Sequence, residues 1–209
     1  MSAARTAILA RLASAQRTAR LPPPPSVERP ETAARSREEC LARFRSELAA
    51  LGVECHVEAS AAAVRARVQA VTQGGRVLCW DPGCLPYQAA SGLPQLVPAS
   101  GPLPEQAQAE FGLTGCEAAI AETGSLVVLS GQGRSRTASL LPPVHVAVVR
   151  PEDLCFSMAE FFRSRAQQVA GSASCTFITG PSRTADIELT LTLGVHGPGR
   201  VVVIVGPAA

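Results

Sequence analysis

Short apolar segments alternate with helical patterns along most of this chain, and this alternation limits the folds that the chain can adopt. Apolar residues at helical spacing cover residues 36–51, with Gly52 placed to end a helix, and a second helical pattern covers residues 60–72. Residues 53–57 and 76–80 predict short strands. Helices that alternate with strands favour a parallel sheet, covered by helices through right-handed crossovers. We therefore expect an α/β fold, a three-layer sandwich with a mostly parallel central sheet.

The middle of the chain has a different character. Residues 81–115 are rich in Pro and Gly and predict turns, with one strand near Leu96 and a short helix over residues 104–111. Three closely spaced strand candidates follow, joined by Gly-rich and Pro-Pro connections: residues 118–121, 124–129 and 144–149. Strands so close together in sequence predict a hairpin or a mixed part of the sheet.

Helical patterns return in the C-terminal part. Residues 151–169 predict a helix that buries four apolar side chains: Leu154, Met158, Phe161 and Phe162. Residues 175–205 then predict a strand, a turn, a helix and a last strand of Val and Ile, with Ser182 as the N-cap and Gly194 just past the helix end. Because a helix N-terminus presents unpaired N–H groups, we expect an anion site at this turn, reinforced by Arg183.

The N-terminal part is set apart by composition. Residues 1–35 predict a helix and a Pro-rich extended linker, before a single domain over residues 36–209. The first 20 residues are rich in Arg and Ala and lack acidic residues, which is also typical of a mitochondrial transit peptide. The simpler interpretation is an amphipathic helix with three apolar residues on one side: Ile8, Leu9 and Leu12.

The basic residues exclude several kinds of chemistry. All 19 residues counted as Lys+Arg are Arg, so a Walker A lysine, a pyridoxal Schiff base and a lysine nucleophile are impossible. A net charge of +2 with 4% aromatic residues does not favour a nucleic-acid surface. No run of about eighteen apolar residues occurs, so we expect no membrane span.

Cysteine and histidine spacing does not favour a metal centre. The seven Cys include no C-x-x-C and no ferredoxin-like run, so we expect no iron–sulfur cluster in this chain, and the sequence identifies no other cofactor. Cys79 and Cys84 flank Trp-Asp-Pro-Gly and could form a metal or redox pair. The simpler expectation is free thiols in a reducing cytoplasm. His56, His145 and His196 are too isolated in sequence to predict a zinc site.

Three motifs in a fixed order give a family resemblance. They are Gly-Cys-Glu-Ala-Ala-Ile-Ala-Glu-Thr-Gly-Ser-Leu-Val-Val from residue 115, Arg-Thr-Ala-Ser-Leu-Leu-Pro-Pro-Val-His from residue 136, and Gly-Pro-Ser-Arg-Thr-Ala-Asp-Ile-Glu from residue 180, followed by Leu-Gly-Val-His-Gly-Pro. Together they resemble the LUD-domain family, and within it the lactate utilisation protein C branch, over roughly residues 36–209.

The resemblance implies a fold and a role. The fold is the α/β sandwich that resembles those of sugar-phosphate isomerases and CoA transferases, here with an N-terminal helical extension. The implied role is that of a non-iron–sulfur subunit or accessory protein in the oxidation of L-lactate to pyruvate, with iron–sulfur subunits as partners.

Polar residues near Gly-rich turns predict a cleft for a small anionic ligand or a nucleotide. The candidate ligand-binding residues are Thr123, Gly124, Gly131, Gly133, Arg134, Gly180, Ser182, Arg183, Thr184, Asp186 and Gly197. The candidate catalytic residues are Glu122, a nucleophile or general base expected beside buried strands, and His196, a proton donor in a Gly-flanked loop.

Simpler structural roles remain open for these residues, as do two other functions. Glu122 could hold backbone amides or an Arg, Arg183 could pair with Asp186, and the Gly131-x-Gly133 pattern could be a hairpin turn. The chain could also be a stand-alone enzyme of acyl or phosphoryl transfer with Glu122 as nucleophile, because a Glu shortly before Gly is the nucleophile in the CoA-transferase relatives. The third alternative is a pure assembly scaffold.

Overall fold

The computed structural model describes three parts of the chain, residues 3–18, 35–184 and 192–208. The chain divides into two compact units, Met1–Ala34 and Arg35–Ala209. The described part of the first unit is one helix, α1 (Ala3–Thr18). Its large apolar side chains are each more than half exposed: Ile8, Leu9 and Leu12. Within the described ranges, no helix is long and apolar enough to cross a membrane.

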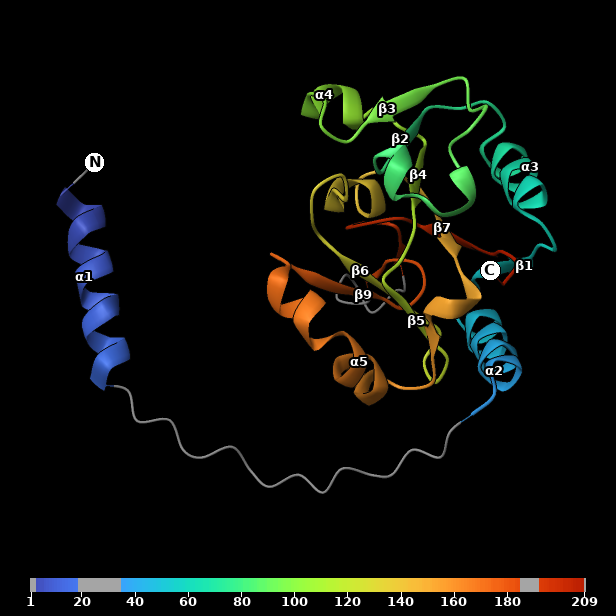
Figure 1. The fold of residues 1–209 in the computed structure, drawn as a ribbon. Coiled ribbons are helices and arrows are strands. Elements are labelled where there is room, and N and C mark those ends of the chain that lie inside the picture. Colours follow the sequence, from blue (N-terminus) through green and yellow to red (C-terminus); the bar gives the residue numbers. More distant parts are fainter. Residues whose placement is uncertain (1–2, 19–34, 185–191, 209) are drawn as a thin grey trace. The chain divides into compact units, whose positions relative to one another are not determined.

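The second unit is built on a six-stranded parallel sheet (Figure 1). Its strand order is β1-β12-β7-β4-β2-β3, and every neighbouring pair is parallel. The strands are β1 (Glu54–Val57), β2 (Val77–Cys79), β3 (Leu96–Pro98), β4 (Phe111–Thr114), β7 (Val144–Val149) and β12 (Arg200–Val205). The predicted α/β fold with a mostly parallel central sheet is therefore confirmed.

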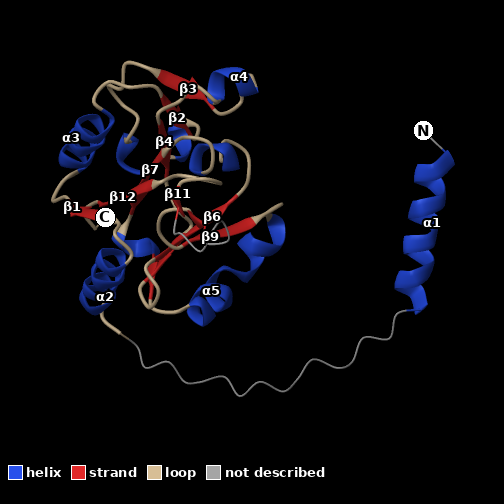
Figure 2. Ribbon diagram, turned by 180° about the vertical axis from the view of Figure 1, so that it is seen from behind, coloured by secondary structure: helices blue, strands red, loops and turns tan. Residues whose placement is uncertain are grey.

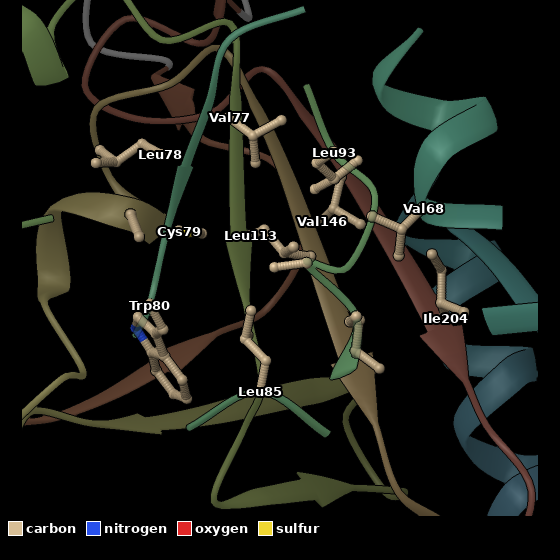
Figure 3. Packing of buried hydrophobic residues seen from close by; sticks show 14 of the residues in the cluster. Val68, Val77, Leu78, Cys79, Trp80, Leu85, Leu93, Leu113, Val146 and Ile204 are labelled. Carbon is tan, nitrogen blue, oxygen red and sulfur yellow. The ribbon is translucent and has the colours of Figure 1, made fainter. Parts of the chain in front are cut away.

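The central strands of this sheet are buried on both faces, which explains the apolar runs of β7 and β12. On one face, Val202 and Ile204 belong to a cluster of buried residues that includes Val64 and Val68 of α3 (Ala61–Thr72). The cluster extends across the sheet to Trp80, which follows β2, and Figure 3 labels Val68, Trp80 and Ile204 among its members. On the other face, the alternate residues of β12 pack with Phe44 and other residues of α2 (Arg37–Ala50). Helices surround the strands in both ribbon views (Figures 1 and 2).

Side-chain caps begin both of these helices, near the positions where the apolar spacing predicts them to start. Ser36 caps α2 in a capping box with Glu39, with hydrogen bonds of 3.1 and 2.7 Å in the two directions. Ser60 caps α3 through a 3.1 Å bond from the Ala63 amide. After α2 the chain turns at Gly52, whose φ of +74° suits a residue without a side chain.

A second sheet of four strands packs against the face of the central sheet that α2 covers. Its order is β8-β5-β6-β9, with strands β5 (Ala118–Ile120), β6 (Ser125–Leu129), β8 (Leu154–Cys155) and β9 (Cys175–Ile178). The β5–β6 and β6–β9 pairs are antiparallel, whereas β5 and β8 are parallel. The expected hairpin exists as β5–β6, but β7 belongs to the central sheet, because the long loop before it carries the chain back there.

Helix α5 (Met158–Gly171) covers the outer face of the second sheet. Phe161 is fully buried, and its ring meets that of Phe177 on β9 edge to face at a centroid distance of 5.8 Å. The expected helix over 151–169 is thus wrong in its first part, where a 3₁₀ turn (Pro151–Asp153) and β8 precede the Ser157 cap. Met158 and Phe162, expected to be buried, are each 42% exposed.

A strand was missed in the Pro- and Gly-rich stretch. Helix α4 is a single turn (Leu103–Gln106), and β4 follows it in the centre of the parallel sheet. The strand sequence Phe-Gly-Leu-Thr contains a glycine, which weakens its strand signal. The glycine is needed there, because a Cβ on Gly112 would overlap the Ala138 carbonyl that packs over the strand.

The helix expected after Ser182 is wrong where the structure describes it. Arg183–Thr184 forms strand β10, which pairs antiparallel with β11 (Thr192–Leu193). Apolar residues at 187, 189, 191 and 193 alternate with polar ones, so the i, i+4 pairs that suggested a helix also satisfy the strand period of two. Residues 185–191 lie outside the described residues.

Candidate functional site

A cavity of about 900 Å³ opens at the carboxyl end of β2 and along β3. Its walls come from the segment after β2, from β3 and the residues after it, from the loop after β6 and from the end of α5. The lining residues are Cys79, Trp80, Asp81, Pro82, Leu96, Pro98, Ala99, Ser100, Ser130, Gly131, Gly133, Arg134, Ser135, Arg136, Gly171 and Ala173.

The sheet topology places this cavity beside a point where the chain changes direction. After β2 the chain passes to β3, which lies next to β2 at the edge of the sheet. After β4, the other neighbour of β2, the chain next joins this sheet at β7 and so moves across the sheet in the opposite direction. Ligands of open α/β sheets bind outside the carboxyl ends of strands at such a switch point. The cavity therefore lies where this class of fold places binding sites.

The loop after β6 forms the polar wall of the cavity. It contains a tight hairpin, in which the Arg134 amide donates to the Gly131 carbonyl at 3.0 Å. The Asp81 amide donates to the Gly133 carbonyl at 2.8 Å and ties this hairpin to the segment after β2. Gly133 has a φ of +71°, and a Cβ on it would lie 2.8 Å from the Cβ of Asp81 and 3.0 Å from the Sγ of Cys84. A glycine is thus required for the two loops to approach each other.

Guanidinium groups outnumber carboxylates around this wall. Arg134 donates to Glu117 Oε2 at 3.0 Å, and its Cζ lies 5.6 Å from the centre of the Trp80 ring. The other oxygen of Glu117 is 3.4 Å from Arg165 on α5. The Arg136 side chain has no acceptor within the described part of the chain. These three guanidinium groups are near only two carboxylates, those of Glu117 and Asp81, so an excess positive charge borders the cavity.

Trp80 forms part of the floor. The indole is only 1% exposed, and its Nε1 donates to the Ser135 carbonyl at 3.1 Å, which joins β2 to the polar loop. The cavity also contains Asp81 and Arg136, which were not selected from the sequence as site residues. Their signal was present: the segment from Cys79 to Cys84 directly follows a buried strand, where sites of parallel sheets form.

Of the candidate residues chosen from the sequence, three line the cavity: Gly131, Gly133 and Arg134. A second group packs on the C-terminal end of α2. A Cβ on Gly124 would lie 3.0 Å from that of Glu47, and one on Gly180 would lie 3.3 Å from that of Leu51. Arg183 donates to the Leu51 carbonyl at 2.6 Å. A cation at the last carbonyls of a helix is favourable, so Arg183 here stabilises a helix C-terminus and does not mark a helix N-terminus.

Glu122 and Thr123 lie in the β5–β6 turn. The Glu122 side chain is exposed, although the sequence prediction expected buried surroundings, and its amide donates to the Phe156 carbonyl at 2.9 Å. Thr123 begins a chain of hydroxyl groups that continues through Ser125 to Thr179, with both O···O distances at 2.7 Å. Ser125 and Thr179 carried no sequence signal for this contact, because they are 54 residues apart.

The remaining candidates surround the β10–β11 strands. The Ser182 amide donates to the Pro198 carbonyl at 2.8 Å, and a Cβ on Gly197 would lie 3.5 Å from that of Ser182. Thr184 is in β10, and His196 is exposed in the loop after β11. Asp186 lies outside the described residues. The candidates thus fall into separate groups, and none of this last group lines the cavity.

The cysteines and the buried histidine offer little reactive chemistry. All seven cysteines are free, and burial raises the pKa of the Cys79 thiol, which lowers its nucleophilic thiolate fraction. Within the described ranges, no three His, Cys, Asp or Glu side chains gather closely enough to hold a metal ion. His145 is fully buried in the central sheet, where its Nε2 lies 2.9 Å from Thr114 Oγ1.

Comparison with known proteins identifies the region that contains the cavity loop. Residues 103–205 match the family model of the LUD domain. The chain contains a LUD domain. The resemblance seen in the sequence motifs is therefore confirmed, and this domain includes β4, both arginines of the polar wall and all four strands of the second sheet.

Curated relatives of the LUD domain share a name. Lactate utilization protein C of Halalkalibacterium halodurans is 41% identical over 102 residues, which are 47% of this chain and 44% of the relative. The Deinococcus radiodurans protein of that name is 41% identical over 100 residues, 47% of each chain. That of Bacillus subtilis is 38% identical over 101 residues, 46% of this chain and 42% of the relative. The matched region spans less than half the length of these relatives.

A solved structure has the same fold over a longer range. The crystal structure of a DUF162 family protein from Deinococcus radiodurans superposes with a TM-score of 0.67 at 26% identity. The superposition covers 83% of this chain and 99% of that one. The fold around the LUD domain is thus shared with a protein solved by crystallography.

Proposed function

We propose that this chain is a non-iron–sulfur component of lactate utilisation and that it binds an anionic ligand in the cavity beside β2 and β3. The relatives named lactate utilization protein C support the biological role. The observation that carries the ligand proposal is Arg136, a guanidinium on the cavity wall that has no acceptor within the described part of the chain. The chain would work in the cytoplasm with iron–sulfur subunits as partners.

The charge distribution explains why the ligand is an anion. Arg134 shares its carboxylate partner, Glu117, with Arg165, so one negative charge serves two guanidinium groups. Arg136 adds a further positive charge from the next turn of the loop. Guanidinium groups bind carboxylate and phosphate through two parallel N–H···O bonds, which are stronger than neutral hydrogen bonds. Arg136 is exposed, so an anion at this wall would replace water at its guanidinium donors.

The chemistry of the overall reaction assigns different tasks to the proteins involved. Oxidation of L-lactate to pyruvate releases two electrons and two protons, and iron–sulfur partners would accept the electrons. The residues of this chain would bind and orient an anion and keep part of it away from water. The stand-alone transferase alternative is not favoured, since Glu122 is exposed and does not line the cavity.

A complementation experiment tests the proposal. The chain would be expressed in a Bacillus subtilis strain that lacks its lactate utilization protein C, and growth on L-lactate would be measured beside strains with and without the native protein. We expect this chain to restore growth and the Arg136→Ala variant to restore much less. Arg37→Ala, which removes an exposed guanidinium from α2, is the matched control and should behave as the parent does.

Equal growth with Arg136→Ala and the parent chain, at equal protein abundance by immunoblot, would show that the cavity is not needed for the function. Failure of the parent chain itself to restore growth would count against the lactate role.

A further inference from the structure

The cavity is much larger than lactate or pyruvate. At about 30 Å³ for each water-sized group, a three-carbon acid fills roughly a fifth of the 900 Å³. With lactate bound, the remaining volume would hold water against apolar walls, which is unfavourable. Lactate or pyruvate alone therefore does not account for the size of the cavity. A volume near 900 Å³ is at the upper end of the range for sites that enclose ligands of drug or cofactor size.

The walls of the cavity separate polar from apolar chemistry. Charged and hydroxyl groups gather on the loop after β6, where Ser130, Arg134 and Arg136 line the space. The β3 side is apolar, with Leu96 and Pro98 at the edge of the central sheet. Leu96 is 40% exposed, so a large apolar side chain lies uncovered in the wall. A ligand that matches both sides has an anionic end and an apolar body.

We propose, on the basis of the function proposed above, that the ligand is a nucleotide-type phosphate ester and not lactate itself. Its phosphate group would lie between Arg134 and Arg136, because phosphate offers enough oxygen acceptors for two guanidinium groups. Its flat ring system would cover Leu96 and Pro98. The cavity volume corresponds to about 30 water-sized groups, which suits a mononucleotide. The chain would then carry or sense a nucleotide for its partners.

Binding to the purified full chain, measured by titration calorimetry, tests the ligand class. The probes are AMP, ADP and flavin mononucleotide, with adenosine, inorganic pyrophosphate, L-lactate and pyruvate as partial matches. We expect at least one of the three nucleotides to bind about tenfold more tightly than pyrophosphate, which lacks the apolar body, and more tightly than L-lactate. If none of the three binds more tightly than pyrophosphate, the proposal is overturned.

Variants on each wall separate the two halves of the ligand. Arg136→Ala should weaken the nucleotide and pyrophosphate alike, by about tenfold or more. Leu96→Asp places a carboxylate on the apolar wall and should weaken the nucleotide by a similar factor while leaving pyrophosphate unchanged. Val57→Asp, on the opposite edge strand β1, is the matched control: Val57 is 47% exposed and does not line the cavity. Arg37→Ala controls for the lost charge. Equal nucleotide affinity in Leu96→Asp and the parent chain would contradict the proposal.

The results separate this proposal from the one on which it rests. If pyrophosphate or lactate binds in a way that depends on Arg136, and no nucleotide binds more tightly, the anion site is supported and the nucleotide proposal is contradicted. No binding of any probe would remove both the anion site and the nucleotide. Nucleotide binding together with failed complementation on L-lactate would keep the ligand class and remove the lactate role.

Discussion

At the scale of a single residue, Gly133 allows the loop after β6 to pack closely against the segment after β2. Its φ of +71° and the nearness of Asp81 and Cys84 both exclude a side chain. We predict that Gly133→Ala lowers the free energy of unfolding by about 1–3 kcal/mol, because a left-handed alanine is strained and its Cβ would push the loops apart. Urea unfolding of the purified variant measures this change.

The same loop supplies a matched control two residues earlier. A Cβ on Gly131 would meet no atom within 4 Å, and Gly131 does not have a positive φ. Gly131→Ala should therefore change the unfolding free energy by less than about 0.5 kcal/mol. Equal stability of the two variants would show that the contact with Asp81 does not determine the position of the loop.

Helix α2 shows the role of Arg183 at the scale of an element. Its guanidinium donates to the Leu51 carbonyl at the C-terminal end of the helix, where a positive charge is favourable. We predict that Arg183→Gln lowers the unfolding free energy by about 0.5–1 kcal/mol in low salt. Binding of ligands in the cavity should not change, because Arg183 does not line it. Denaturant unfolding and titration calorimetry of the same preparation measure both effects.

The opposite end of α2 gives the control for this prediction. Arg37 is the first residue of the helix, where a positive charge is unfavourable, so Arg37→Gln should leave stability unchanged or raise it slightly. A loss of nucleotide or pyrophosphate binding in Arg183→Gln alone would restore the anion site that the sequence predicted at this residue.

Elements were predictable where local and tertiary signals agree. Helix α2 has a capping box, apolar spacing and a glycine just beyond its end, and each points to the same helix. Strand β4 was missed because Gly112 is required by contact with Ala138, a neighbour that sequence reasoning does not reveal. The β10–β11 pair was predicted as a helix because apolar residues four apart satisfy both periods.

The candidate site was harder to predict than the elements, for a physical reason. Sequence patterns identify turns that can bind anions but do not say which turns meet in space. Gly131, Gly133 and Arg134 do line the cavity, whereas Gly124 and Gly180 allow close packing on α2. Positive φ values serve both purposes equally well, so a glycine-rich turn alone does not distinguish a ligand site from a packing contact.

At the scale of the whole molecule, protonation of His145 makes the stability of the folded protein depend on pH. It lies on β7 in register with Gly112 of β4 and Val201 of β12, and burial lowers its pKa from 6.5 to about 4. A buried imidazole is neutral in the folded protein but takes up a proton in the unfolded chain at mildly acidic pH. Its contribution to stability is therefore complete above pH 6.5, falls as the pH decreases, and is lost below about pH 4.

We predict that the free energy of unfolding falls by about 2 kcal/mol between pH 7 and pH 5 because of His145. The carboxylates with lowered pKa values, Glu39 and Glu54, start from 4.5 and lose their contribution only at lower pH, so they do not produce this decrease. His145→Leu should be nearly independent of pH over that interval, whereas His196→Gln, at an exposed position, should retain the decrease. Urea unfolding of the three proteins at pH 7, 6 and 5 compares the slopes. An unchanged slope in His145→Leu would mean that another group takes up the proton.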